Sequence, residues 1–412
     1  MSLPATAMPR VIAAEAVSNF GSMLSRLAIP WLATLALQAT PAQMAALLVA
    51  DVAAAALAAL VLGAWVDRHG RRAVMLLADG ARAAVLGLLA LAAWRGWLGM
   101  AGLLLAAAAG GACTVVFELA RSAWMAQALA EADLPRRNAQ IAVAGSLSET
   151  AAFALGGWLY QGLGALAALL VDAASYAASA LCLRGVPEQR AAVTPATDES
   201  AWRAWRRDTA AGLQAIAARP PLRALAVIEG LLAFSMALTG TAYMIFVSRD
   251  IGLPTGQQGM VFAMGGLGAV LGAALAPRLG RGIGPGRTMA LGLALHAAGL
   301  FCLTQIPGPG WLALALLLAQ QIVGDAGHTL HQVHDRTLRQ TAVPAELLAR
   351  ADAGLRGVGQ AATLLGALAG AALGEIWPVR GLLVLALAFA AAAALWAGWR
   401  LAEKSQPVSP ST

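Results

Sequence analysis

Gly63-Ala-Trp-Val-Asp67-Arg68-His-Gly70-Arg71-Arg72 is the stretch of this chain that says most about its fold. It is a short basic segment with a single acid, and it separates two apolar runs at 42–65 and 72–93. Each run is long enough to cross a bilayer as a helix, which takes roughly 20 mostly apolar residues. A basic connection between two such runs predicts a cytoplasmic loop that joins two transmembrane helices.

The residue types in this loop suggest a mechanical role. Gly63 permits a close approach of two helices, and Gly70 permits a tight turn. Asp67 can pair with nearby arginines and can lie at the N-terminus of a neighbouring helix, where the helix dipole favours an anion. The alternative is an ordinary basic loop. We interpret the following residues as a conformational latch on the cytoplasmic face: Gly63, Asp67, Arg68, Gly70, Arg71 and Arg72.

The composition of the whole chain indicates an integral membrane protein. Of its 412 residues, 59% are hydrophobic and only 12% are charged, whereas soluble domains carry about 25% charged residues. The net charge is +7, but the basic residues lie in short connections and form no stripe, which argues against a nucleic-acid partner. Cys113, Cys182 and Cys302 are isolated in apolar runs and provide neither a disulfide framework nor a zinc site.

The apolar runs predict twelve transmembrane helices. The first six lie at roughly 10–37, 42–65, 72–93, 98–125, 138–160 and 164–184. The second six lie at roughly 222–248, 256–279, 287–305, 310–336, 347–374 and 380–401.

The distribution of arginine predicts the topology. Arginines gather in the even-numbered connections, and the odd-numbered connections are nearly free of charge. Both termini are therefore expected in the cytoplasm of a multi-pass protein of the bacterial inner membrane. Trp202 and Trp205 belong to a predicted amphipathic helix and are expected at the level of the lipid headgroups. The predicted domains are an N-terminal six-helix bundle at 1–184, a cytoplasmic linker containing that amphipathic helix at 185–221, a C-terminal six-helix bundle at 222–404 and a disordered tail at 405–412.

A weak internal repeat supports two related halves. With an offset of 213 residues, Gln127 matches Gln340 and Arg137 matches Arg350. Each match lies at the junction between the fourth and fifth helices of its half. Parallel repeats of this kind are a known transporter architecture. We therefore predict an all-α membrane fold of two pseudo-symmetric six-helix bundles.

The loop at 63–72 resembles the signature loop of the major facilitator superfamily. Three further stretches are similar to the drug and siderophore exporter branch, which includes enterobactin and macrolide efflux proteins: Gly21-Ser-Met-Leu-Ser-Arg-Leu-Ala-Ile-Pro30-Trp31, Asp133-Leu-Pro-Arg-Arg-Asn138-Ala139 and Arg339-Gln340-Thr-Ala-Val-Pro344-Ala-Glu346-Leu347. The resemblance covers the entire chain and implies a secondary transporter. It also implies that helices one, four, seven and ten line a central cavity.

Ionisable residues inside the predicted spans are the candidates for function, because each costs roughly 2.5–3.5 kcal/mol at mid-bilayer. We predict proton coupling at Glu15, Glu229, Asp325 and His328, and substrate contact at Asn19, Arg26, Glu118, Arg121 and His331. Glu118 and Arg121 are three residues apart and can pair, which leaves a purely structural role open. For His331 and Asp335 the alternative is that water solvates both side chains near the cytoplasmic end of the tenth helix.

The leading functional hypothesis is a proton-coupled exporter of a small amphipathic or chelating molecule, such as a siderophore or a drug-like compound. It would act as a monomer in the lipid bilayer, without a cofactor or a resident metal. A nutrient importer of the same fold is the first alternative. A membrane metalloenzyme built on the histidines of the tenth helix is the second, but these imidazoles do not project together and His296 is solitary.

Overall fold

The computed structural model describes residues 7–130, 133–189, 201–343 and 345–401. In these ranges the chain forms helices, with two short π-helical turns and no strand. The side chains of Asp67, Trp202 and Trp205 lie outside the described part of the chain, and so does the tail at 405–412. The predicted roles of these residues therefore stay predictions, whereas the predicted all-α fold class is confirmed.

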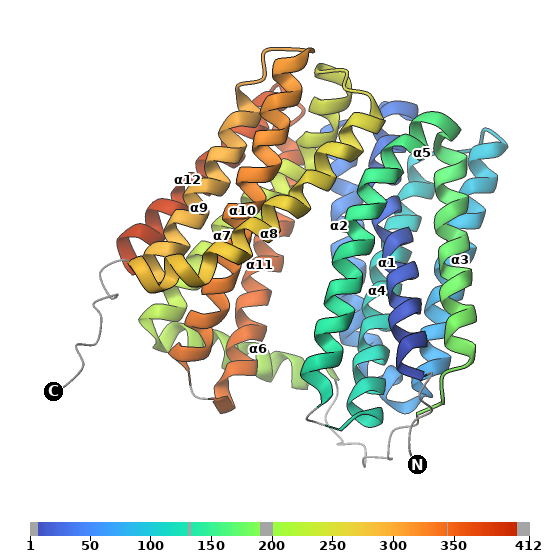
Figure 1. Ribbon diagram of the computed structural model, residues 1–412, viewed down its shortest axis with the longest axis horizontal. Helices are drawn as coiled ribbons and strands as arrows, with labels where there is room; N and C mark the ends of the chain where they lie inside the picture. Colours follow the sequence, from blue (N-terminus) through green and yellow to red (C-terminus); the bar gives the residue numbers. More distant parts are fainter. Residues whose placement is uncertain (1–6, 131–132, 190–200, 344, 402–412) are drawn as a thin grey trace. The chain divides into compact units, whose positions relative to one another are not determined.

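Five helices provide the six spanning segments of the first half (Figure 1). They are α1 (Ala7–Trp31), α2 (Pro41–Arg68), α3 (Arg71–Trp94), α4 (Met100–Ala128) and α5 (Leu134–Arg184). α5 contains both the fifth and the sixth predicted span, because the chain turns at Gly164 without a loop. Gly164 has a φ of 78° and a ψ of 178°, a conformation that only glycine adopts without strain.

The second half contains six spanning helices and one shorter helix before them. They are α6 (Ala201–Ala218), α7 (Pro220–Ile245), α8 (Thr255–Ile283), α9 (Pro285–Thr304), α10 (Trp311–Ala342), α11 (Ala345–Leu373) and α12 (Val379–Leu401). α6 occupies the segment for which an amphipathic helix was predicted, and it lies crosswise to α11 (Figure 1).

Eight of the described helices are long and apolar enough to cross a membrane on length and composition alone: α2, α3, α4, α5, α7, α8, α9 and α12. α1, α10 and α11 are of similar length but contain more polar residues. A helix satisfies every backbone polar group internally, so these alanine- and leucine-rich segments can be buried in lipid without unpaired N–H or C=O groups.

The described helices form two compact units, the first mostly from residues before Trp202 and the second mostly from residues after it. In the first unit, α1 and α3 pack against α5, and α3 packs against α4. In the second unit, α7 packs against α11 and α12, and α9 packs against α10 and α12. Because α11 and α12 correspond to the two parts of α5, the two units share one packing pattern.

Both units also contain a π-helical turn at an equivalent place. α1 continues into the turn Leu32–Ala36, and α7 continues into the turn Phe246–Asp250. An offset of 214 residues relates the two turns, within one residue of the offset found in the sequence repeat. The predicted pseudo-symmetry of the two halves is confirmed.

Each unit has its own buried apolar core. In the first unit, Met75, Phe117 and Trp124 belong to a cluster contributed by α1 to α5. In the second unit, Leu225 and Leu355 belong to a cluster contributed by α6, α7 and α9 to α12. These two clusters fix the positions of the helices that carry the charged side chains of the candidate site.

Candidate functional site

The signature loop, residues 63–72, is bound by the segment that follows α5. Glu188 accepts hydrogen bonds from the backbone N–H groups of Arg72 and Ala73, at 2.9 and 3.3 Å. Its carboxylate also lies 3.6 Å from Nε of Arg72. Arg72 in turn donates to the carbonyl oxygens of Val186 and Arg184, at 3.0 and 3.4 Å. The N-terminus of α3 thus receives from Glu188 the anion that its dipole favours.

Two glycines of the signature loop do not have the roles predicted for them. Gly70 has a φ of −61° and a ψ of 126°, which any residue can adopt, so no tight turn requires it. A Cβ there would instead meet the Glu188 carboxyl group at 2.6 Å. A Cβ at Gly63 would meet nothing within 4 Å among the described atoms, so the predicted close helix approach is not present. Arg71 is buried, at 3% exposure, and Arg68 is exposed.

In the first unit, Arg121 of α4 pairs with Glu15 of α1. Nε of Arg121 lies 3.2 Å from Oε2 of Glu15, and the two side chains are 15% and 18% exposed. Glu118, which its spacing allowed as a partner of Arg121, is exposed on α4. Arg121 faces α1 and pairs with Glu15 instead.

The other two polar candidates of α1 lie apart from this ion pair. Asn19 donates through Nδ2 to the carbonyl oxygen of Gly145 in α5, at 2.9 Å. Its amide therefore joins two helices of the unit. Arg26 is exposed, and its Nη1 lies 3.9 Å from the sulfur of Met23.

A buried arginine, Arg82 of α3, connects four helices of the first unit. It is 4% exposed and donates to the carbonyl oxygen of Cys113 at 2.7 Å and to the hydroxyl of Ser18 at 3.4 Å. Its guanidinium also lies 5.3 and 5.0 Å from the ring centroids of Phe117 and Tyr176. A planar group with five donors suits such a junction, whereas a lysine would not.

Two carboxylates are fully buried in the same unit. Asp79 accepts a hydrogen bond from Ser179 at 2.7 Å. Asp172 accepts hydrogen bonds from Ser25 of α1 and Ser175 of its own helix. These bonds hold the second part of α5 against α3 and α1, so both acids have a structural explanation.

In the second unit, Arg339 of α10 lies among three carboxylates. Its Nη2 is 3.0 Å from Oε2 of Glu229 in α7 and 2.7 Å from Oδ2 of Asp335. Its Nη1 is 3.7 Å from Oδ1 of Asp352 in α11. The solvated position considered for Asp335 is wrong, because its side chain is only 8% exposed. It faces Arg339 inside the bundle.

Asp325 and His331 also lie on α10. Asp325 accepts a hydrogen bond from Gln321 at 3.3 Å, and it packs so closely against Gly265 of α8 that a Cβ there would collide with its carboxylate. His331 is 3% exposed, which contradicts a wetted position for it as well. It is buried because the backbones of α9 and α10 approach closely at Gly292.

His296 of α9 is a neighbour of His328, so the prediction of a solitary histidine is wrong. Their ring centroids are 5.5 Å apart, and the ring of His331 is 6.3 Å from that of His328. His328 lies 2.9 Å from the amide of Gln332. Within the described residues, no group of three His, Cys, Asp or Glu side chains is arranged to hold a metal ion.

The two units contain equivalent ion pairs. Each pair joins a carboxylate on the first spanning helix of the unit to an arginine on its fourth spanning helix, Glu15 to Arg121 and Glu229 to Arg339. The offset of 214 residues that relates the π-helical turns also relates Glu15 to Glu229. The two arginines depart from that offset by four residues, about one helical turn.

Comparison with known families identifies the fold. Residues 11–351 match the model of the Major Facilitator Superfamily. The chain belongs to the Major Facilitator Superfamily. It is an integral membrane transporter of that type, as the signature loop predicted. A comparison with curated proteins gives no match, and the exporter branch stays a prediction.

Solved structures of other superfamily transporters are similar across almost the whole chain. A bacterial homologue of the iron transporter ferroportin, in an inward-facing state, has a TM-score of 0.74 at 17% identity, covering 95% of this chain and 97% of that one. The nucleoside transporter NupG has a TM-score of 0.73 at 15% identity, covering 97% and 99%. A bacterial homologue of the human lysosomal transporter Spinster has a TM-score of 0.72 at 14% identity, covering 99% and 100%. At these identities the likeness shows the fold alone.

Three residues that make central contacts in this chain were not among the functional candidates predicted from the sequence. Arg82 carried a usable signal, because it and Asp79 are charged residues three apart inside an apolar span. Arg339 lies just beyond the predicted end of the span at 310–336, so it was counted as part of a cytoplasmic connection. Glu188 lies in a short connection, where no periodic pattern indicates what a side chain contacts.

Proposed function

We propose that this superfamily member is a proton-coupled exporter of a small amphipathic or chelating molecule, such as a siderophore or a drug-like compound. The observation that carries the proposal is the pair of equivalent ion pairs, Glu15–Arg121 and Glu229–Arg339. Charged groups inside a span are costly, so their repetition at equivalent places in two halves favours a role in transport over two unrelated structural roles.

In the proposed cycle, a proton and the substrate compete for the same carboxylates. Around Arg339 the carboxylates of Glu229, Asp335 and Asp352 outnumber the single guanidinium, so a basic or polar group of the substrate can bind while Arg339 stays paired. A proton that enters from the periplasmic side neutralises Glu15, Glu229 or Asp325 and displaces the substrate. Alternating access then couples inward proton movement to outward substrate movement.

The proton has a candidate relay near Asp325. His328 lies one turn from it on α10, and its ring lies near those of His296 and His331. Imidazole is the side chain that exchanges protons near neutral pH. Asn19, Arg26, Glu118 and Arg121 are proposed to contact the substrate in the first unit, as predicted from their positions on the first and fourth helices.

The direction of transport is tested first, in cells. Deletion of the protein is expected to raise the internal concentration of the substrate, which a metabolite comparison of deleted and expressing cells identifies. A nutrient importer would lower it instead. The compound found in this way is then the probe for measurements in vesicles.

Coupling is tested in inside-out vesicles that carry an imposed pH gradient. Glu15→Gln, Glu229→Gln and Asp325→Asn are each expected to flatten the pH dependence of substrate uptake between about pH 5 and 8. Exchange of labelled for unlabelled substrate needs no net proton movement. Because the same carboxylates are proposed to bind the substrate, exchange by each variant should need a higher substrate concentration, and exchange that persists at saturating substrate shows that the variant is folded.

The matched control is Glu149→Gln, which neutralises an exposed carboxylate of α5. This variant should keep the wild-type pH dependence. If all three test variants also keep it, the assignment of proton coupling to these carboxylates is wrong.

A further inference from the structure

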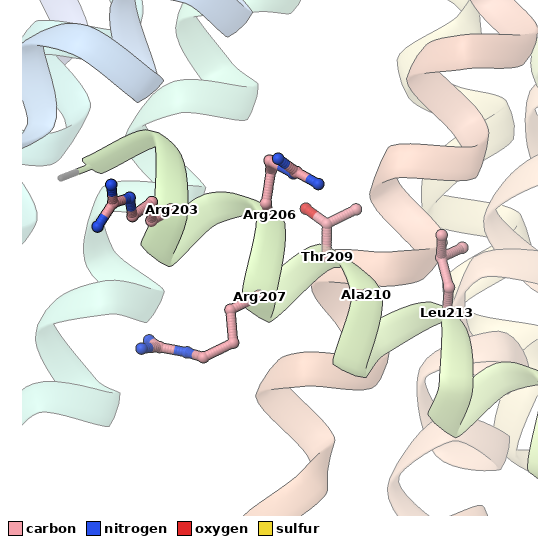
Figure 2. A pocket seen from close by; sticks show the side chains of 6 residues that line it. All are labelled: Arg203, Arg206, Arg207, Thr209, Ala210 and Leu213. Atoms are coloured by element: carbon pink, nitrogen blue, oxygen red, sulfur yellow. The ribbon is translucent and has the colours of Figure 1, made fainter. Parts of the chain in front are cut away.

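α6 presents three arginines on one face. Arg203, Arg206 and Arg207 are exposed, and in Figure 2 their side chains extend outward from the helix. At about 100° per residue, they lie within one arc of about 160° together with three further residues. The six side chains line a depression of about 470 Å³: Arg203, Arg206, Arg207, Thr209, Ala210 and Leu213.

The opposite face of α6 fixes the helix against the second unit. Ala215 and Ile216 are buried, at 8% and 7% exposure. A Cβ at Gly212 would meet the backbone of Arg350 and Gly354, so the backbones of α6 and α11 are in direct contact. α6 lies crosswise to α11 (Figure 1). Because α11 is a spanning helix, we infer that α6 runs along the plane of the membrane. The arginine distribution of the chain assigns this side to the cytoplasm.

We propose that the depression on α6 binds the phosphate headgroup of an anionic phospholipid in the cytoplasmic leaflet. Charge complementarity supports this ligand, because that leaflet carries a negative surface potential. Guanidinium groups bind phosphate through two parallel N–H···O bonds, and neighbouring arginines can share one phosphate. The inference rests on the proposed topology and is independent of proton coupling.

Leu213 distinguishes a lipid from a soluble phosphate. It is 48% exposed and lines the same depression as the arginines. An apolar side chain beside a phosphate site on a helix that lies in the membrane plane can contact the first methylenes of an acyl chain. A soluble phosphate ester would make no use of it.

The test is lipid binding to the full-length protein. The protein is reconstituted in nanodiscs of equal parts phosphatidylglycerol and phosphatidylcholine, released into detergent, and examined by native mass spectrometry for retained lipid. Wild-type protein should retain phosphatidylglycerol preferentially. The triple variant R203Q/R206Q/R207Q should bind it roughly 100-fold more weakly, because the hydrogen bonds of three guanidinium groups to the charged phosphate are lost.

The matched control is the triple variant R278Q/R281Q/R287Q. It removes three exposed arginines from the end of α8 and the start of α9, in a connection assigned to the same side of the membrane. This variant should retain phosphatidylglycerol as wild-type protein does. Equal loss in both triple variants would show a general effect of charge and would overturn the site.

Two further measurements separate lipid from soluble phosphate. Leu213→Asn should weaken binding of full-length phosphatidylglycerol, and glycerol phosphate in solution should not displace the retained lipid. Unchanged lipid binding by Leu213→Asn, or displacement of the lipid by glycerol phosphate at equal concentration, would overturn the assignment to a phospholipid.

Discussion

At the scale of single residues, Arg82 shows how a permanent charge is kept inside a membrane protein. Its guanidinium is occupied by a carbonyl, a hydroxyl and two aromatic rings, and Asp79 and Asp172 lie close enough to interact with its charge. The guanidinium donates to α1 through Nη1 and to α4 through Nη2, and the rings of Phe117 and Tyr176 pack on it from α4 and α5. Removal of Arg82 would leave two buried acids without a neighbouring positive charge.

Arg82→Gln is therefore expected to lower the free energy of unfolding by about 3–5 kcal/mol, the usual cost of breaking a buried charge cluster on one side. Thermal unfolding of the detergent-solubilised protein measures the change. Arg95→Gln is the control, because Arg95 is exposed and its guanidinium lies over Trp94 and Trp97. Equal unfolding temperatures for Arg82→Gln and Arg95→Gln would contradict a central role for Arg82.

The sequence indicated which charged residues lie inside spans, but it did not identify several of their partners. The sequence indicated that Glu15 and Arg121 are buried charges, because both interrupt apolar spans. Their pairing depends on the rotation of α1 and α4 about their axes, which spacing along one helix does not specify. For this reason the spacing of α4 left Glu118 as a possible partner of Arg121, whereas the structure places Glu15 there.

At the scale of elements, the contact between Glu188 and the start of α3 joins the linker to the signature loop. Glu188 accepts from the N–H groups of Arg72 and Ala73, and Trp124 of α4 donates to the carbonyl oxygen of Pro187 at 2.9 Å. The beginning of the linker is thus fastened to two helices of the first unit. The first residues of the linker therefore pack as part of the first unit.

Glu188→Ala is expected to expose this segment to protease. Loss of an acceptor at a helix N-terminus costs about 0.5–2 kcal/mol, so trypsin should cleave after Arg184 faster in this variant than in wild-type protein in the same detergent. Gly70→Ala should have the same effect, because its Cβ would collide with the Glu188 carboxyl group. Glu375→Ala removes another exposed carboxylate and is the control. If cleavage after Arg184 is equally slow in all variants, this contact does not hold the linker.

At the scale of the whole molecule, each half contains an apolar cluster built from its own residues. The buried residues of the first core lie between Ala7 and Val186, and those of the second between Ile216 and Leu401. Neither cluster takes a buried side chain from the other half of the sequence. We therefore expect each half to fold without the other.

A fragment of residues 1–189, expressed alone, is expected to insert into the membrane and to resist trypsin within its helices. A fragment of residues 1–163 is the control. It lacks Leu183 and Val186 of the first core as well as Asp172, so it should be degraded rapidly. Equal resistance of the two fragments would show that the second part of α5 is dispensable for this core.

The architecture of the whole molecule was predictable because it depends on the hydropathy and charge of whole segments and not on single contacts. Apolar runs of span length, arginine-rich even connections and the loop at 63–72 together specify a twelve-span transporter. For the ion pairs, the sequence identified the carboxylates but not both of the arginines. Glu15 and Glu229 were found as charges in spans, whereas Arg339 lies in the extra turns by which α10 exceeds its predicted end.

The turn at Gly164 determines where this chain can accept insertions and deletions. The two parts of α5 meet at this single residue, and no spare chain separates them. One inserted residue would rotate the following helix by about 100°. Asp172 would then leave Ser25, and the register of the sixth span against α1 would be lost. Insertions and deletions should accordingly be tolerated in the connection between α9 and α10 and rejected at the tip of α5.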